Sequence, residues 1–151
     1  MTPRTLFTLA ALMGGVLQFN TAQAADTTVE MLNEKDGTMM AFSTPLVVIE
    51  AGDTVTWKAT HKTHSVAFVQ GGTPDGVAPL TATFNQDAQY TFQTPGMYLY
   101  KCPAHYGMGM IGIVVVGQKP TNVEAIKQLS LMPAAKKRLT ALLAQYATGN
   151  P

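Results

Sequence analysis

The sequence contains a single cysteine, Cys102, and places it beside a histidine and two methionines in the stretch KCPAHYGMGM. His105 lies three residues after the cysteine, and Met110 lies five residues after that histidine. Calcium and magnesium take oxygen ligands, and structural zinc usually takes four cysteine or histidine ligands. Copper accepts thiolate, imidazole and thioether together, and two histidines, one cysteine and a distant axial methionine form the blue-copper electron-transfer site. The stretch therefore indicates copper chemistry.

A blue-copper set needs a second histidine, which has to come from elsewhere in the chain. His64 begins a candidate strand and can approach the cysteine from a neighbouring part of a β-sandwich. His61 lies in the polar stretch THKT and is expected to be an exposed loop residue. Met108 and Met110 have the same parity, so either side chain could face the metal. The simpler alternative for the cysteine is an inert core thiol, because free cysteines are usually buried.

The elements that must position these residues read mostly as β-structure. Alternating and continuous apolar patterns predict about seven short strands separated by turns, which is typical of a β-sandwich. The predicted strands cover residues 27–32, 45–49, 54–58, 64–69, 89–92, 97–102 and 111–116. Trp57 is expected in the core, and the uninterrupted apolar run 111–116 predicts a strand buried on both faces.

The end of the chain, residues 121–147, reads as helical. Thr121 and Glu124 have the spacing of a capping box, and Pro133 fits the first turn of a second helix. An apolar stripe on that second helix is expected to pack against the sandwich. Its members are Leu139, Leu142, Leu143 and Tyr146.

The first 24 residues have the layout of a secretory signal peptide. Arg4 precedes an apolar run from Leu6 to Phe19, which is short for a membrane span, and Ala22-Gln23-Ala24 is a small-polar-small cleavage motif. We expect cleavage after Ala24, leaving residues 25–151 as one exported domain. Removing Arg4 balances nine basic against nine acidic side chains. Overall charge then points to no particular partner, and we expect neither a nucleic-acid nor a membrane partner.

The mature chain resembles the cupredoxin family of type 1 blue copper proteins. The resemblance rests on Val29–Asn33 as the opening strand, on Pro74-Asp75-Gly76 in a middle loop, and on CPAHYGMGMIGIVVVG within residues 98–117. It implies an all-β, Greek-key sandwich of about eight strands, and the two C-terminal helices set the chain apart from plastocyanin and amicyanin. It also implies four copper ligands, with Met108 left at the surface. They are His64, Cys102, His105 and Met110.

The resemblance further implies a monomeric periplasmic electron carrier and not an enzyme. The expected partners are periplasmic redox proteins: copper nitrite reductase, nitrous oxide reductase or c-type cytochromes. They would dock at the His105 face, with Lys62 and Lys101 nearby. Two positions depart from the family pattern, because Ala104 stands where proline usually precedes the loop histidine, and Ser65 stands where asparagine usually follows the first histidine. Both departures affect the expected reduction potential and not the ligand set.

Two other classes of protein deserve comparison. A thiol enzyme would use Cys102 as nucleophile with His105 or His64 as base, but no motif for a substrate cleft or oxyanion site is present. A periplasmic copper chaperone would hold the ion loosely through several methionines. Met39, Met40 and Met108 are consistent with that alternative.

Overall fold

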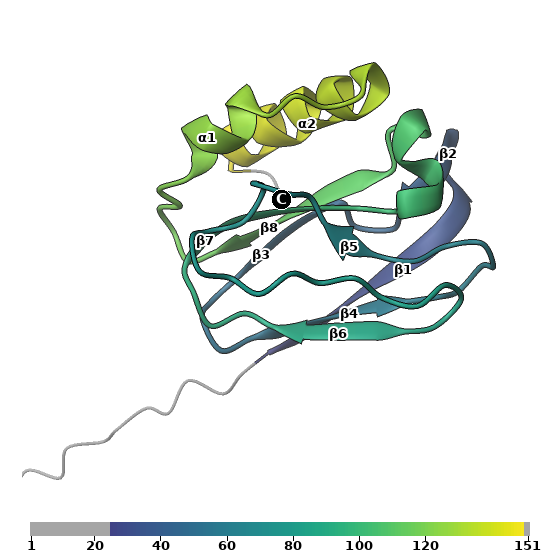
Figure 1. Cartoon of the computed structure of the whole chain (residues 1–151), viewed down its shortest axis with the longest axis horizontal. Coiled ribbons are helices and arrows are strands. Elements are labelled where there is room, and N and C mark those ends of the chain that lie inside the picture. The colour runs from purple at the N-terminus through teal and green to yellow at the C-terminus, as the bar shows by residue number, and fades with distance from the viewer. Residues whose placement is uncertain (1–24, 150–151) are drawn as a thin grey trace, which may run out of the picture.

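The computed structural model of the chain describes residues 25–149, which form two four-stranded sheets packed face to face and two helices on the outside of one sheet (Figure 1). The predicted signal peptide, residues 1–24, lies outside the described residues. Within residues 25–149, no helix combines the length and apolar character needed to cross a membrane.

The first sheet has the order β2-β1-β4-β6 and is polar on its outer face. Threonines there pair across strands: the hydroxyls of Thr54 and Thr91 lie 2.9 Å apart, and the Gln89 amide donates to the Thr56 hydroxyl at 2.9 Å. β1 runs parallel to β4 and antiparallel to β2. The bounds of these strands are β1 Asp26–Lys35, β2 Thr38–Phe42, β4 Thr54–Lys58 and β6 Ala88–Thr91.

The second sheet has the order β3-β8-β7-β5, and its two central strands are buried on both faces. Tyr98 and Tyr100 of β7 enter the core between the sheets, whereas Met97 and Leu99 enter a second core beneath the helices. This two-sided burial explains why the run 111–116 carries no polar residue, as predicted. The bounds are β3 Leu46–Ile49, β5 Ala67–Phe68, β7 Gly96–Lys101 and β8 Ile111–Val116.

The core between the sheets is dominated by aromatic rings. Trp57 is fully buried, as predicted, and meets Tyr100 edge to face with ring centroids 5.1 Å apart. Phe42 meets the same tyrosine at 4.8 Å, and such pairs add about 0.5–1.5 kcal/mol beyond the area they bury. Cys102 and Met110 belong to this same core cluster. One end of the rigid aromatic core therefore carries part of the candidate site.

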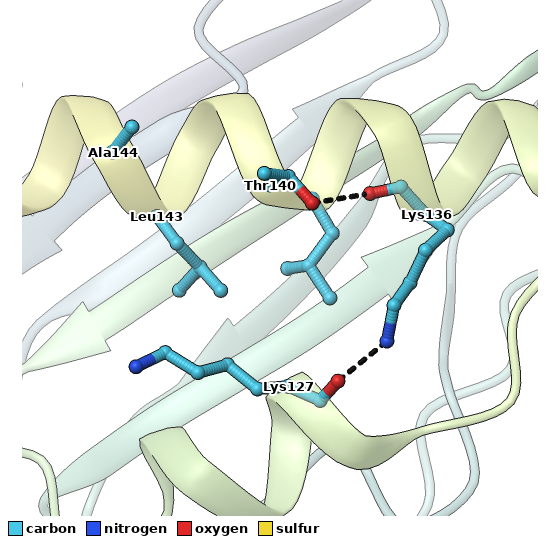
Figure 2. Close-up of a pocket in the computed structure, with 6 residues that line it drawn as sticks. Lys127, Lys136, Thr140, Leu143 and Ala144 are labelled. Atoms are coloured by element: carbon cyan, nitrogen blue, oxygen red, sulfur yellow. Dashed lines mark hydrogen bonds between the residues drawn. The ribbon is translucent and has the colours of Figure 1, made fainter.

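The helices α1 (Val123–Gln128) and α2 (Pro133–Ala147) cover the outer face of the second sheet. Leu139 and Leu142 are buried there, and Leu143 and Tyr146 pack beside them, so the predicted stripe is confirmed. An open groove of about 400 Å³ lies between the two helices. Its lining residues are drawn in Figure 2, where the Lys136 ammonium donates to the carbonyl oxygen of Lys127. That contact satisfies a carbonyl at the end of α1 and ties the helices together.

The structure corrects three expectations about local structure. The capping box is wrong: α1 begins after Asn122, whose side chain bonds both backbone groups of Met97 at 2.8 Å and makes no capping bond. Residues 64–69 contribute only the two-residue strand β5. Strand β2 and the short 3₁₀ helix η1 (Pro103–Met108) were not predicted.

Candidate metal centre

The segment 102–110 forms a closed loop between β7 and β8. The Cys102 N–H donates to the Met110 carbonyl at 3.0 Å, and the Met110 N–H donates to the His105 carbonyl at 3.2 Å. Pro103 starts η1, where a proline loses no helical hydrogen bond. Gly109 ends the helix at φ 87°, and a Cβ there would lie only 3.0 Å from the Ala134 carbonyl oxygen of α2. The loop therefore needs glycine at position 109 and returns Met110 to the side of Cys102.

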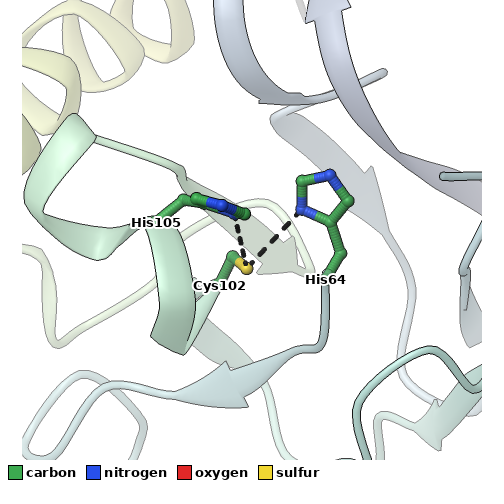
Figure 3. Close-up of side chains that lie close together, drawn as sticks. All are labelled: His64, Cys102 and His105. Carbon is green, nitrogen blue, oxygen red and sulfur yellow. Dashed lines mark hydrogen bonds between the residues drawn. The ribbon is translucent and has the colours of Figure 1, made fainter. Parts of the chain in front are cut away.

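Three potential ligand atoms converge at the end of the core (Figure 3). The Cys102 sulfur lies 3.7 Å from His64 Nδ1 and 3.6 Å from His105 Nδ1, and all three donor atoms fall within 4.8 Å of one another. The two imidazole rings lie 4.8 Å apart, centroid to centroid. His64 and Cys102 are fully buried, and His105 is half-buried. The structure thus brings together the three histidine and cysteine side chains that the sequence singled out.

The spacing of these atoms fits a bound metal ion better than it fits mutual hydrogen bonds. One thiol hydrogen can satisfy only one of two imidazole lone pairs. Three ligands at about 2.1 Å from one ion in a plane would lie about 3.6 Å apart, close to the two sulfur–nitrogen distances of Cys102. The donor set of one sulfur and two imidazole nitrogens in an apolar core suits copper.

His64 is held in the form that a metal ligand requires. Its Nε2 lies 3.0 Å from the Asn33 side-chain oxygen, so Nε2 carries the hydrogen and the Nδ1 lone pair faces the sulfur. Burial lowers the pKa of His64, and the nearby His105 and His61 lower it further. The imidazole is therefore neutral at neutral pH.

Asn33 was not identified from the sequence as part of the site. Asparagine is disfavoured in strands, so its place in β1 was the available signal. His61 is exposed, as expected. Its Nδ1 accepts a hydrogen bond from the Asn33 backbone N–H at 2.9 Å.

The two positions that depart from the family pattern have different surroundings. Ala104 is exposed beside His105. Ser65 is fully buried, and its hydroxyl has no hydrogen-bond partner. Ser65 therefore makes no side-chain hydrogen bond between the ligand-bearing segments. The His64 segment is instead tied to a neighbouring loop, where the Asn85 N–H donates to the His64 carbonyl at 2.9 Å.

The two methionines of the loop lie in different environments. Met110 is 1% exposed and packs in the core with Cys102, whereas Met108 is 56% exposed. Of the two lysines expected near the site, Lys62 is exposed and Lys101 is half-buried. The Lys101 ammonium lies 4.7 Å from the centre of the Tyr106 ring.

Together, a two-sheet sandwich and a buried Cys–His₂ cluster at its end define a metal-binding protein of the cupredoxin class. Comparison with known proteins agrees. Residues 29–117 match the family model described as copper binding proteins, plastocyanin/azurin family. The chain therefore belongs to the plastocyanin/azurin family of copper-binding proteins.

Pseudoazurins are among the relatives that align with most of the chain. The pseudoazurin of Methylorubrum extorquens is 38% identical over 94% of this chain and 96% of its own, and that of Paracoccus pantotrophus is 37% identical over 81% and 84%. The crystal structure of pseudoazurin from Methylobacterium extorquens AM1 superposes with a TM-score of 0.78 and 39% identity, covering 81% of this chain and 99% of that one. By this membership the chain is a small blue copper electron carrier and not an enzyme.

Proposed function

We propose that one type 1 copper ion is held by His64, Cys102, His105 and Met110. The observation that carries this proposal is the convergence of the Cys102 sulfur and the two Nδ1 atoms within 4.8 Å. Burial of Met110 and exposure of Met108 support Met110 as the residue that would supply the fourth ligand. When bound, copper supplies a one-electron redox couple. The four side chains fill its coordination positions, so no position is left for a substrate.

Each protein group has a distinct role in this proposal. Cys102, at the end of β7, provides a thiolate within the apolar core. His64 is neutral and oriented by Asn33, which limits rearrangement when the charge of the site changes. His105 reaches the surface, so electrons enter and leave through its imidazole.

The ligand set is tested by reconstitution of the mature protein with cupric salt. The expected product is intensely blue, because a thiolate bound to Cu²⁺ gives a charge-transfer absorption, and Cys102→Ser should remain colourless. Met110→Gln should change the absorption and electron paramagnetic resonance spectra, whereas the matched variant Met108→Gln should leave both unchanged. A blue Cys102→Ser protein would refute the proposal.

We further propose that the signal peptide is cleaved after Ala24 and that residues 25–151 work in the periplasm as a monomer. The donor and acceptor would be periplasmic redox proteins, with copper nitrite reductase of denitrification as the principal acceptor. They would dock over His105, where exposed Pro103, Ala104 and Met108 form an apolar rim. Lys62 and Lys101 would add positive charge beside that rim, suiting an acidic partner surface.

Docking is tested by the rate of electron transfer from the reduced protein to copper nitrite reductase at several ionic strengths. Lys62→Glu should slow association and weaken its salt dependence. Lys119→Glu is the matched control, because Lys119 follows the far end of β8. Equal rates for both variants would exclude Lys62 from the docking surface.

A periplasmic copper chaperone is the second candidate, favoured by the exposed thioethers of Met39 and Met108, which are 55% and 56% exposed. A chaperone has to release its ion readily, whereas a carrier retains it through many redox cycles. Rapid loss of copper to a competing apoprotein, prevented by Met39→Leu, would favour the chaperone. Retention of copper under the same conditions would favour the carrier.

A further inference from the structure

His61 is a histidine that the electron-carrier function does not use, yet it makes a specific hydrogen bond. The ladder between parallel strands β1 and β4 ends at the pair Glu30 and Lys58. Beyond that pair, the His61 N–H donates to the Met31 carbonyl at 3.1 Å. The Asn33 N–H then has no strand carbonyl to bond and donates to His61 Nδ1 at 2.9 Å. The imidazole therefore continues the ladder where β4 has ended.

Asn33 connects this imidazole to the candidate metal centre. Its backbone N–H is held by His61, and its side-chain oxygen lies 3.0 Å from His64 Nε2. The opposite nitrogen of His64 faces the Cys102 sulfur at 3.7 Å. Two hydrogen bonds thus link the exposed imidazole of His61 to the buried imidazole of His64, a candidate metal ligand.

The proton positions along this connection are determined by its chemistry. A backbone N–H is always a donor, so His61 Nδ1 has to present a lone pair. The Asn33 side-chain oxygen is always an acceptor, so His64 Nε2 has to carry a hydrogen. A His61 that holds Asn33 in place therefore favours the tautomer of His64 whose Nδ1 can bind a metal.

We propose that His61 is a positioning residue for the copper site, acting on His64 through Asn33. The proposal rests on the proposed ligand set only in its effect on copper. It implies a pH dependence, because an imidazolium donates from both nitrogens and cannot accept the Asn33 N–H. Protonation of His61 then releases one of the supports of His64.

The charged groups around this loop are few. Glu30 of β1 accepts from the Thr60 hydroxyl at 2.9 Å, and Asp87, before β6, accepts from the Ala59 N–H at 2.8 Å. The carboxylate of Glu34 is occupied by the Gly37 N–H. Lys58 and Lys62 lie close to His61 in the sequence, and His64 is near enough for His61 to lower its pKa.

The test compares two substitutions at position 61. His61→Ala removes the acceptor, whereas His61→Asn keeps one, because asparagine Oδ1 and histidine Nδ1 are the same number of bonds from Cα. Copper release to a chelator should be about two- to tenfold faster in His61→Ala, as for loss of one net hydrogen bond. It should return to the wild-type rate in His61→Asn.

A double-mutant cycle separates a positioning role from a general structural one. Asn33→Ala removes the side-chain oxygen that reaches His64 but keeps the backbone N–H that reaches His61. Adding His61→Ala to Asn33→Ala should therefore cause no further change in copper release or reduction potential. Additive effects would overturn the proposal.

Nuclear magnetic resonance provides a readout that does not depend on copper. Spectra are recorded on the protein as purified and in its diamagnetic cuprous form. When the solution is acidified, the Asn33 amide resonance should shift and the His64 Nε2–H should exchange faster, because a protonated His61 ring cannot accept the Asn33 N–H. Both changes should be absent in His61→Asn, which retains His64 and His105 and is therefore the matched control.

Two results would count against the proposal in distinct ways. If the Asn33 and His64 signals do not respond to pH in the wild type, the connection itself is refuted. If they respond but copper release and potential are the same in His61→Ala and the wild type, His61 does not position the metal centre. Failure of the ligand set would appear separately, as a wild-type protein without the charge-transfer absorption.

Discussion

Replacing Asp53 by asparagine should destabilise the folded protein, because this buried carboxylate joins the residue before β1 to the turn before β4. Asp53 is 8% exposed. One oxygen accepts the Ala25 N–H at 2.7 Å, and the other accepts the Glu50 N–H at 3.0 Å. Asparagine has the same shape but only one acceptor oxygen, so one of the two N–H groups would face an amide donor.

The expected loss follows from the two bonds. A hydrogen bond to a charged group contributes about 1.5–3 kcal/mol. Asp53→Asn loses one such bond and weakens the other, so we expect a fall of about 2–3 kcal/mol in the free energy of unfolding at pH 7.

The effect should depend on pH. The N–H groups of Ala25 and Glu50 lower the pKa of Asp53 below its ordinary value. A carboxyl with a lowered folded-state pKa stabilises the fold fully above its unfolded pKa of about 3.9, and the stabilisation is lost as the pH falls through the folded-state value. The difference between wild type and Asp53→Asn should therefore be full above about pH 5 and should shrink below pH 4.

The contact between Ala25 and Asp53 should also change in strength when the signal peptide is removed. If the signal peptide is removed after Ala24, the nitrogen of Ala25 becomes an α-ammonium, and its bond to Asp53 becomes an ion pair. The mature protein should then be more stable than one that retains Gln23-Ala24. That advantage should disappear in Asp53→Asn.

Urea unfolding of the mature protein, followed by fluorescence of Trp57, measures these differences. Asp26→Asn is the matched control, because Asp26 directly follows Ala25, at the start of β1, and is exposed. A loss below about 0.5 kcal/mol, the range of an ordinary surface substitution, would refute the assigned role of Asp53. A loss that stays constant down to pH 3 would refute the pH reasoning.

Three further substitutions test other contacts by the same unfolding measurement. Ser65→Ala should change stability by less than about 1 kcal/mol, because its buried hydroxyl has no partner to lose; a larger loss would reveal a partner. Gly112→Ala should cost at least about 3 kcal/mol, because the new Cβ would lie 2.3 Å from the Tyr100 ring, and near-wild-type stability would contradict that packing. Asn122→Ala should cost about 2 kcal/mol by freeing both backbone groups of Met97, and an unchanged midpoint would show that these groups find other partners.

The elements predicted from local patterns were mostly found. β4 and β8 match their predicted ranges, and Pro133 begins α2. These predictions succeeded because side-chain period and proline geometry depend on neighbouring residues alone. The capping box failed because Asn122 is used in tertiary contacts with Met97, which outweigh a local motif.

The sequence by itself determined the chemistry of this protein and the strands that carry it. Cys102, His105 and two methionines fall within nine residues between two recognisable strands, so the donor types and their approximate meeting point follow from composition and spacing. The expectation that Met110 and not Met108 faces the metal came from the family resemblance. Only the tertiary structure decided how His64 is supported. Asn33 is separated from His64 by 31 residues and from His61 by 28. Hydrogen bonds over such separations have no local periodicity. The bond to His61 forms because the β1–β4 ladder has ended and the Asn33 N–H needs another acceptor, and the bond to His64 forms because the fold places the Asn33 side chain beside it.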